Sequence, residues 1–334
     1  MKHMAKRLAC LFLAGIMLLS MTACGKSQGN KKVTLKFSTS TSETSSWTKA
    51  AYKFAELVEE ASNGNITCSV YSSDQLSGGN QAKGIEMVMN GSTDMSFHSN
   101  LVYSTIDDRF NVISLPFMFS STEDADAKLA GEAGNELKAI LDGYGLDCLG
   151  FGENGFRQIT NSVREIRSVE DFAGIKFRIN NSNMLIDTYQ CLGADPTSMN
   201  WSEVFTSLQQ GAIDGQENPL DVIYSGSIYE VQKYISLWGC TYDALFLCMN
   251  KETLEGLSPE YQEIIRNCAA QACDYQKELN RSVMDEQLAA FEAAGMTVTS
   301  REDMDIDNII AAVQPVYDKY ESIVGADLLA KFRG

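Results

Sequence analysis

Strand-like and helix-like segments alternate along most of the chain. Residues 33–38 alternate apolar and polar side chains as a strand does, and apolar residues then recur at helical spacing from Trp47 to Val58. A second strand-like run at 66–71 precedes a second amphipathic helical run at 81–89. Because parallel strands need a helical crossover between them, this order predicts an α/β fold with mainly parallel pairing.

Later segments extend the pattern. A helix is predicted over 123–141, a strand over 175–179 and a short helix beginning near Trp201. The Ser-Pro pair at 258–259 is a helix-start signal, and no glycine or proline follows it until Gly295. We therefore expect one helix of roughly 50 Å near the C-terminus, long enough to touch two lobes.

Length and charge narrow the class of protein. A chain of 334 residues predicts about two domains. Its 44 acidic residues outnumber 27 Lys and Arg and give a net charge of −17, which repels phosphate backbones and argues against a nucleic-acid partner. An anionic ligand would need a local positive site.

The N-terminal segment has the features of an export signal. Three cations within the first seven residues precede the apolar run 8–23, which is too short to span a membrane. The six residues that end at Cys24, Leu-Ser-Met-Thr-Ala-Cys, resemble a bacterial lipobox. We therefore expect a lipoprotein signal peptide over 1–23, a flexible tether over 24–32 and an extracytoplasmic protein that is lipid-anchored to the cell membrane through Cys24.

Seven cysteines follow Cys24 without the spacing of a disulfide framework. Their number is odd and no CxxC pair occurs. We expect buried free thiols, with a Cys240–Cys248 bridge as the open alternative.

The chain offers little for catalysis. His98 is the one histidine that remains after the export signal, and no GxSxG, HExxH, P-loop or GxGxxG motif occurs. We therefore expect no catalytic residues, no metal site, no cofactor and no enzyme activity. A secreted carbohydrate-active enzyme stays an alternative, because so many carboxylates could supply a glycosidase pair.

The strand over 175–179 carries two cations on one side. Its three apolar residues alternate with Lys176 and Arg178, so Arg178 faces away from the core that they enter. The stretch 151–220 around it gathers arginine, amide and aromatic residues in an otherwise acidic chain. This concentration indicates an anion pocket.

Several motifs in this stretch carry a family resemblance. In order they are Gly155–Gln158, Asp171–Arg178, Leu192–Pro196, Ser202–Phe205 and Asp214–Pro219. The series resembles the DctP-type substrate-binding proteins of tripartite ATP-independent periplasmic (TRAP) transporters. Asp74–Leu76 and Gly91–Met95 fit the same family's N-terminal lobe, and the similarity covers about Val33 to the C-terminus.

The resemblance implies a two-lobed, periplasmic-binding-protein-like fold of type II character, with a hinge and a long C-terminal helix touching both lobes. Lobe I would comprise 33–154 plus about 244–283, and lobe II 155–243 plus about 284–334. The lobes would close on a small organic acid and deliver it to TRAP membrane permease subunits driven by an ion gradient.

The resemblance also implies which residues bind the ligand. Arg178 matches the family arginine that pairs with the ligand carboxylate, since a guanidinium makes two parallel charge-assisted bonds to it. Arg157 matches a second ligand arginine, with a salt bridge at the hinge as the alternative. Asn218 and Asn154 match pocket amides, although an Asn before Pro can simply belong to a turn.

An aromatic contact and the opposite lobe complete the set. Trp201 occupies the position of an aromatic over the ligand, with packing in the core as the alternative. Trp47, Glu43 and His98 lie near positions that line the other lobe, where a lone histidine can equally be packed.

The residue types favour a sugar acid. One carboxylate clamp with amides, a histidine and an aromatic suits a hexuronate such as glucuronate or galacturonate. A C4-dicarboxylate or another small carboxylate is the alternative, for which Arg157 could supply a second cation. Sialic acid is disfavoured, because sialic-acid members have acidic residues where this chain has Gly78, Gly79 and Ser99. A sensor subunit that presents its loaded form to a receptor would share the pocket.

Overall fold

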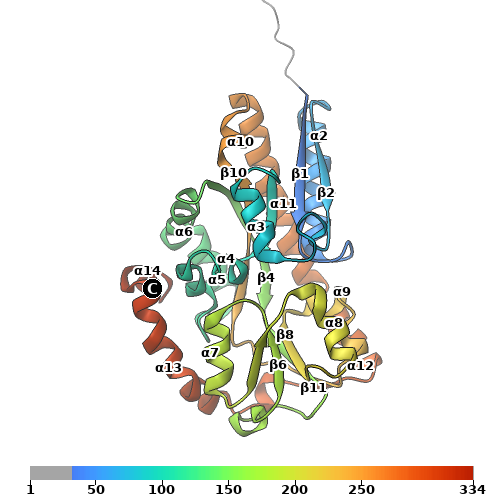
Figure 1. The fold of residues 1–334 in the computed structure, drawn as a ribbon, viewed down its shortest axis with the longest axis vertical. Helices are drawn as coiled ribbons and strands as arrows, with labels where there is room; N and C mark the ends of the chain where they lie inside the picture. The colour runs from blue at the N-terminus through green and yellow to red at the C-terminus, as the bar shows by residue number, and fades with distance from the viewer. Residues whose placement is uncertain (1–31, 334) are drawn as a thin grey trace, which may run out of the picture. The chain divides into compact units, whose positions relative to one another are not determined.

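Two β-sheets organise residues 32–333, the part of the chain that the computed structural model describes (Figure 1). The first sheet has the order β2 (Ile66–Tyr71), β1 (Val33–Thr39), β3 (Met95–Ser99), β10 (Tyr242–Asn250) and β4 (Leu146–Phe156). The second has the order β11 (Thr297–Thr299), β9 (Tyr234–Ser236), β5 (Gln158–Asn161), β8 (Gly215–Asn218), β6 (Lys176–Ile179) and β7 (Asp195–Ser198). We call the first sheet and its helices lobe I, and the second sheet and its helices lobe II.

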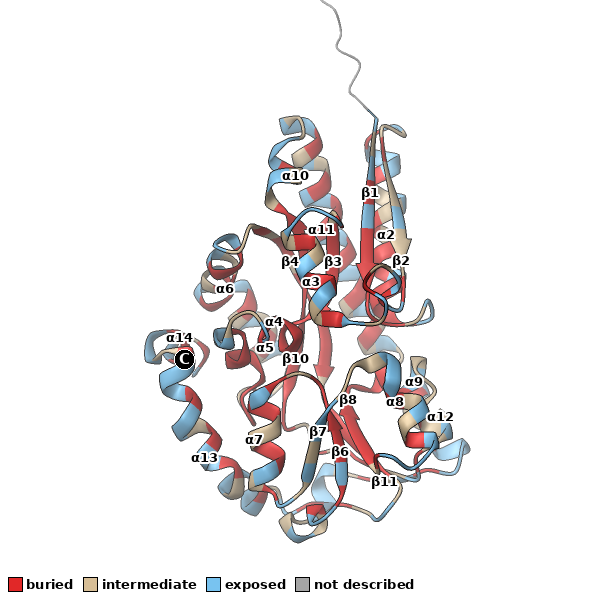
Figure 2. Cartoon of the chain, viewed as in Figure 1, coloured by how far each residue is buried: buried red, intermediate tan, exposed pale blue. Residues whose placement is uncertain are grey.

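Helices cover both faces of each sheet (Figure 2). Those of lobe I are α2 (Ser46–Ala61), α3 (Gln81–Met89), α4 (Asn100–Tyr103), α5 (Thr122–Ala130), α6 (Glu132–Asp142), α10 (Lys251–Glu255) and α11 (Pro259–Ser282). Those of lobe II are α7 (Asn183–Cys191), α8 (Trp201–Gln209), α9 (Leu220–Ser225) and α12 (Met284–Ala293). The last two described helices are α13 (Ile306–Val324) and α14 (Ala326–Arg333). Short 3₁₀ turns, among them Asp108–Ser114, lie earlier in the chain. The described helices include none that is long and apolar enough to cross a membrane.

The α/β expectation and the two lobes are confirmed, but the sheets are mixed. β1 pairs in parallel with β2 and β3, as the helical crossovers predict. β10 runs antiparallel to β3 and β4, and β5 runs antiparallel to β8 and β9. The chain passes between the lobes at two of these antiparallel strands. It goes from β4 to β5 through the single residue Arg157, and it returns from β9 to β10.

Two predicted helices are each divided in the structure. The helix expected over 123–141 is interrupted at Gly131, whose backbone is extended at φ −93° and ψ −156°. The long helix expected up to Gly295 is interrupted at Val283, at φ −106° and ψ −1°. α11 buries Ala269 in the core of lobe I, whereas α12 buries Phe291 in a core of lobe II. The interruption therefore lies where the chain leaves one packing surface for another, and α11 and α12 together touch both lobes.

The C-terminal helices contact elements of both lobes. Lys331 on α14 pairs with Glu132 and Glu136 on α6, at 2.9 and 2.5 Å. Lys319 on α13 pairs with Asp187 on α7 at 2.6 Å. One side of the molecule is thus braced across the lobes by the end of the chain.

All seven cysteines within the described residues are free thiols, as expected, so the Cys240–Cys248 bridge is absent from this structure. Five of them are buried, and desolvation raises the pKa of even the partly buried Cys68 thiol to about 12. Such thiols behave as small apolar side chains.

Candidate functional site

A cavity lies between the two lobes. Lobe I contributes Ser40, Thr41, Trp47, Gln81, Ser99, Val102 and Asn154, and lobe II contributes Arg178, Asn180, Trp201, Asn218 and Val222, with Arg157 at the connection between the lobes. The lining is mostly hydroxyls, amides and aromatic rings. The charged side chains among it are two arginines.

Arg178 presents a guanidinium to this cavity from β6. The strand alternation that the sequence predicted holds, because Phe177 and Ile179 are fully buried in the core while Arg178 faces the cavity. Its Nε donates to the carbonyl oxygen of Met199 at 2.9 Å. The guanidinium carbon lies 5.8 Å from the centre of the Trp201 ring, within the range of a cation–π contact.

The charge of Arg178 has no carboxylate at ion-pair distance within residues 32–333. Burial lowers its pKa to about 9; the charge of Glu217 opposes this lowering, Arg157 adds to it, and Glu203 opposes it. The group therefore stays protonated at neutral pH while lacking a counter-ion. Such a buried cation is costly unless an anion pairs with it.

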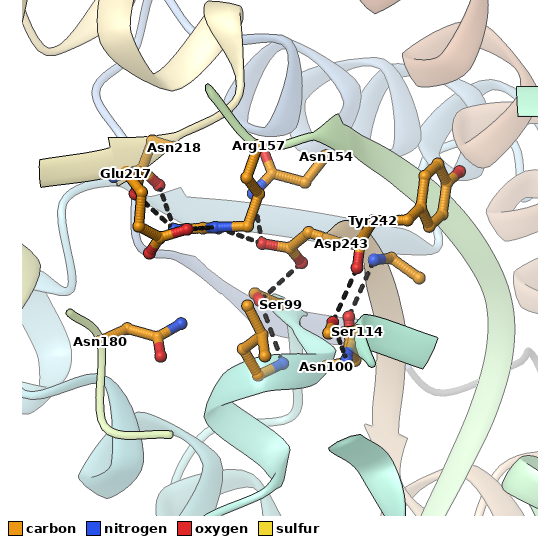
Figure 3. Close-up of polar contacts among 12 residues, drawn as sticks. Ser99, Asn100, Ser114, Asn154, Arg157, Asn180, Glu217, Asn218, Tyr242 and Asp243 are labelled. Carbon is orange, nitrogen blue, oxygen red and sulfur yellow. Dashed lines mark hydrogen bonds and ion pairs between the residues drawn. The ribbon is translucent and has the colours of Figure 1, made fainter. Parts of the chain in front are cut away.

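Arg157 stands in the opposite situation, because two carboxylates surround it (Figure 3). Its Nε and Nη2 donate to the carboxylate of Glu217 on β8, and its Nη1 donates to Asp243 on β10. Nη2 also donates to the Glu217 carbonyl oxygen at 2.7 Å and to Asn218 Oδ1 at 2.9 Å. The geometry is that of the hinge salt bridge, the alternative to a free ligand arginine.

This cluster is fully desolvated. Burial raises the pKa of Glu217 and of Asp243, against the lowering influence of Arg157, and the pKa of Arg157 is itself raised by the two carboxylates. Asp243 also accepts from Ser99 Oγ at 2.6 Å and from Asn154 Nδ2 at 2.8 Å. Lobe I and lobe II strands are thus joined by one hydrogen-bonded network beside the cavity (Figure 3).

The predicted amides and aromatics meet at the cavity. Asn154 Oδ1 accepts from Trp47 Nε1 at 3.2 Å, so these two lobe I residues orient each other. Asn218 donates to Gln216 Oε1 at 2.6 Å. Trp201 lies in the first turn of α8, is half-buried and lines the cavity.

Glu43 and His98 lie away from the cavity lining. Glu43 is exposed and lies beside Tyr52, whose pKa is raised chiefly by burial and then by the Glu43 charge. His98 is fully buried on β3, with Nε2 3.2 Å from Asp74 Oδ1. Cys24, the lipidation site expected from the sequence, lies outside the described residues.

Several cavity residues escaped the sequence analysis. Ser40, Thr41 and Gln81 have common side chains in no distinctive motif, so nothing marked them, and Ser99 was considered only as a position that differs from sialic-acid members. Asn180 could have been found, because it stands two residues after Arg178 on an extended segment and so shares its side. Within residues 32–333, no group of three His, Cys, Asp or Glu side chains is arranged to hold a metal ion.

Replacement of Arg157 tests the network. Arg157→Met would leave Glu217 and Asp243 buried without their cation, so the free energy of unfolding should fall by about 3–5 kcal/mol in urea denaturation. Arg109→Ala is the control, because it breaks the exposed pair with Asp107 and should cost less than about 1 kcal/mol. Equal, small losses in the two variants would contradict a stabilising role for the network.

Comparisons with known proteins agree with this architecture. A relative that is 34% identical over 96% of this chain and 95% of its own length is the 2,3-diketo-L-gulonate-binding periplasmic protein YiaO of Escherichia coli strain K12. Another, 30% identical over 84% of both chains, is the C4-dicarboxylate-binding periplasmic protein DctP of Rhodobacter capsulatus. A TRAP periplasmic solute-binding protein from Sulfitobacter sp. NAS-14.1, solved with bound β-D-galacturonate, has a TM-score of 0.86 and 30% identity, and the match covers 90% of this chain and 99% of that one.

Residues 37–323 match the family of bacterial extracellular solute-binding proteins, family 7, also called DctP. The match spans both sheets and every cavity residue named above. The chain therefore belongs to the DctP family, the solute-binding proteins of TRAP transporters.

Proposed function

We propose that this protein captures a hexuronate such as galacturonate or glucuronate between its lobes and delivers it to TRAP permease subunits for ion-gradient-driven uptake. The observation that carries the proposal is Arg178, a buried guanidinium that faces the cavity without a carboxylate partner in the described chain. A ligand carboxylate would supply the missing charge through two parallel hydrogen bonds. Lobe closure would bury that pair.

The rest of the cavity suits hydroxyl groups better than a second carboxylate. The charge of Arg157 is already met by Glu217 and Asp243, so a dicarboxylate would bring its second charge to a site without a free cation. Hydroxyl and amide side chains, such as Thr41, Asn154 and Asn180, can instead donate to and accept from sugar hydroxyls. This charge balance supports a sugar acid over a C4-dicarboxylate.

The names of similar proteins include binders of both classes of ligand, sugar acids and C4-dicarboxylates. The Escherichia coli relative and the Sulfitobacter structure concern sugar acids, whereas the Rhodobacter relative concerns C4-dicarboxylates. Family membership alone therefore leaves the choice to the cavity. The dicarboxylate reading is the second candidate, to be decided by binding.

Capture without turnover is part of the proposal. A glycosidase needs two carboxyl groups free to act on the ligand. Here Glu217 and Asp243, two carboxylates that contact the cavity-lining Arg157, both accept from its guanidinium. A receptor role therefore accounts for these residues, and unchanged ligand recovered after long incubation would support it.

A ligand panel tests the carboxylate clamp. D-galacturonate and D-glucuronate should raise the melting temperature of the purified protein, because a ligand that binds the native state alone stabilises it. Arg178→Ala should weaken galacturonate binding in calorimetry by about 2–5 kcal/mol, at least about 30-fold. Arg164→Ala, an exposed arginine of the same lobe, should bind as the wild type does.

Each result of this panel has a distinct meaning. A melting shift with succinate but no uronate would discard the sugar acid and keep the solute receptor. Wild-type affinity in Arg178→Ala would refute the clamp.

The indole of Trp201 tests the sugar-face argument. Trp201→Ala should weaken galacturonate binding by about 2 kcal/mol, roughly 30-fold, because a buried ring contact is lost, whereas Trp201→Phe should retain most of the affinity. Calorimetry with galacturonate, and with succinate if the wild type binds it, measures both losses. Equal losses for the two acids would remove the evidence for a sugar ring over the indole.

The proposal includes a lipid anchor at Cys24 and an extracytoplasmic location, motivated by the lipobox-like residues that end there. In a bacterial host, wild-type protein should be recovered in the membrane fraction with an acylated Cys24, seen by mass spectrometry. Cys24→Ser should be recovered in soluble form. A mature wild-type chain that starts elsewhere and carries no acyl group would contradict the anchor.

A further inference from the structure

Another buried carboxylate, apart from Glu217 and Asp243, lies at the contact between the lobes, outside the cavity. Asp221 stands in the first turn of α9 in lobe II and is buried. Its Oδ2 accepts from the backbone N–H and from the hydroxyl of Ser46 in lobe I, both at 3.0 Å. Its Oδ1 accepts from Gln287 Nε2 at 3.3 Å. Asp221 is thus held by polar groups of both lobes.

Ser46 is the first residue of α2, so its amide is one of those that the helix itself leaves without a partner. The positive end of a helix of 16 residues also favours a carboxylate there. Ser46 Oγ additionally accepts from Gln276 Nε2 at 2.9 Å, and Gln276 Oε1 accepts from the Glu153 N–H at 2.7 Å. The contact therefore joins α9 and α12 to α2 and α11.

The neighbours of these two residues in the sequence are walls of the cavity. Trp47 follows Ser46, and Val222 follows Asp221; both line the cavity, from opposite lobes. Two further hydrogen bonds between the lobes use neutral groups. Ser42 Oγ donates to the Ser225 carbonyl oxygen at 3.0 Å, and Ser202 Oγ donates to the Gly79 carbonyl oxygen at 3.1 Å. Among these three contacts, the one through Asp221 is charge-assisted and buried.

We infer that Asp221 is a positioning residue that holds the lobes closed around the ligand without touching it. In docking α9 on the start of α2, Asp221 sets the separation of the two cavity walls formed by Trp47 and Val222. The inference rests on the proposed function in so far as closure traps a solute. Loss of the Asp221 carboxylate should therefore raise the dissociation rate of the ligand more than it changes the association rate, because an open receptor still admits the solute.

Asp221→Asn tests the inference with little change in volume. The amide keeps one acceptor and loses the charge. For D-galacturonate, stopped-flow tryptophan fluorescence should show a dissociation rate at least tenfold higher, with an association rate within about threefold of the wild type. Ser46→Ala, which keeps the backbone bond to Asp221, should change the dissociation rate in the same direction by less.

Asp171→Asn is the matched control. Asp171 also accepts from two backbone N–H groups and a hydroxyl, those of Arg167 and Ser168, but all lie within lobe II. This variant should leave both rates unchanged. Wild-type dissociation rates in Asp221→Asn and Ser46→Ala would overturn the inference. If Asp221→Asn does not fold, the Ser46→Ala rate decides alone.

A measurement without ligand separates this inference from the proposed function. In hydrogen exchange by mass spectrometry, peptides spanning residues 41–50 should exchange faster in Asp221→Asn than in the wild type or Asp171→Asn. If the wild type binds none of galacturonate, galactonate and succinate, the proposed function fails. Hydrogen exchange would still test the contact of Asp221 with Ser46. Equal exchange in all three proteins would overturn the inference whatever the ligand.

Discussion

The buried ion cluster of Arg157, Glu217 and Asp243 is the interaction on which the arrangement of the two lobes depends. Arg157 is the single residue between β4 of lobe I and β5 of lobe II, Glu217 lies on β8 of lobe II, and Asp243 lies on β10 of lobe I. Burying charges this deeply is costly unless they are paired and hydrogen-bonded. The cluster therefore specifies how the strands meet at the passage between lobes.

The same cluster determines the electrostatics of the cavity. Because Arg157 is neutralised by its neighbours, Arg178 is the arginine left with an unmet charge at the cavity. Under the proposed function, one carboxylate of the ligand would pair with Arg178, and the lining side chains other than the two arginines are uncharged. The selectivity proposed for this receptor thus follows from which arginine is paired, and closure follows from separate contacts such as that of Asp221 with Ser46.

Much of the fold and part of the site followed from local patterns. The alternation of strands and helices, the side on which Arg178 faces and the start of α8 near Trp201 were all predicted, because each depends on neighbours in the sequence. The continuous helix up to Gly295 was wrong, since the break at Val283 arises from packing against two lobes rather than from a helix-breaking residue. The environments of Glu43 and His98 could not be predicted either: Glu43 is exposed on the surface, and His98 is buried inside lobe I.

The sequence by itself determined the α/β class, the export-signal pattern, the family motifs and the side of its strand on which Arg178, the residue proposed to pair with an anion, lies. The tertiary structure decided that Arg157 is occupied by carboxylates 60 and 86 residues further along the chain, and that hydroxyls of lobe I face amides of lobe II. The physical reason is that sequence patterns report on residues that are close together in the chain. Periodicity and motifs report a residue's backbone and its side, whereas a counter-ion is supplied by whichever distant strand the fold brings within hydrogen-bond distance.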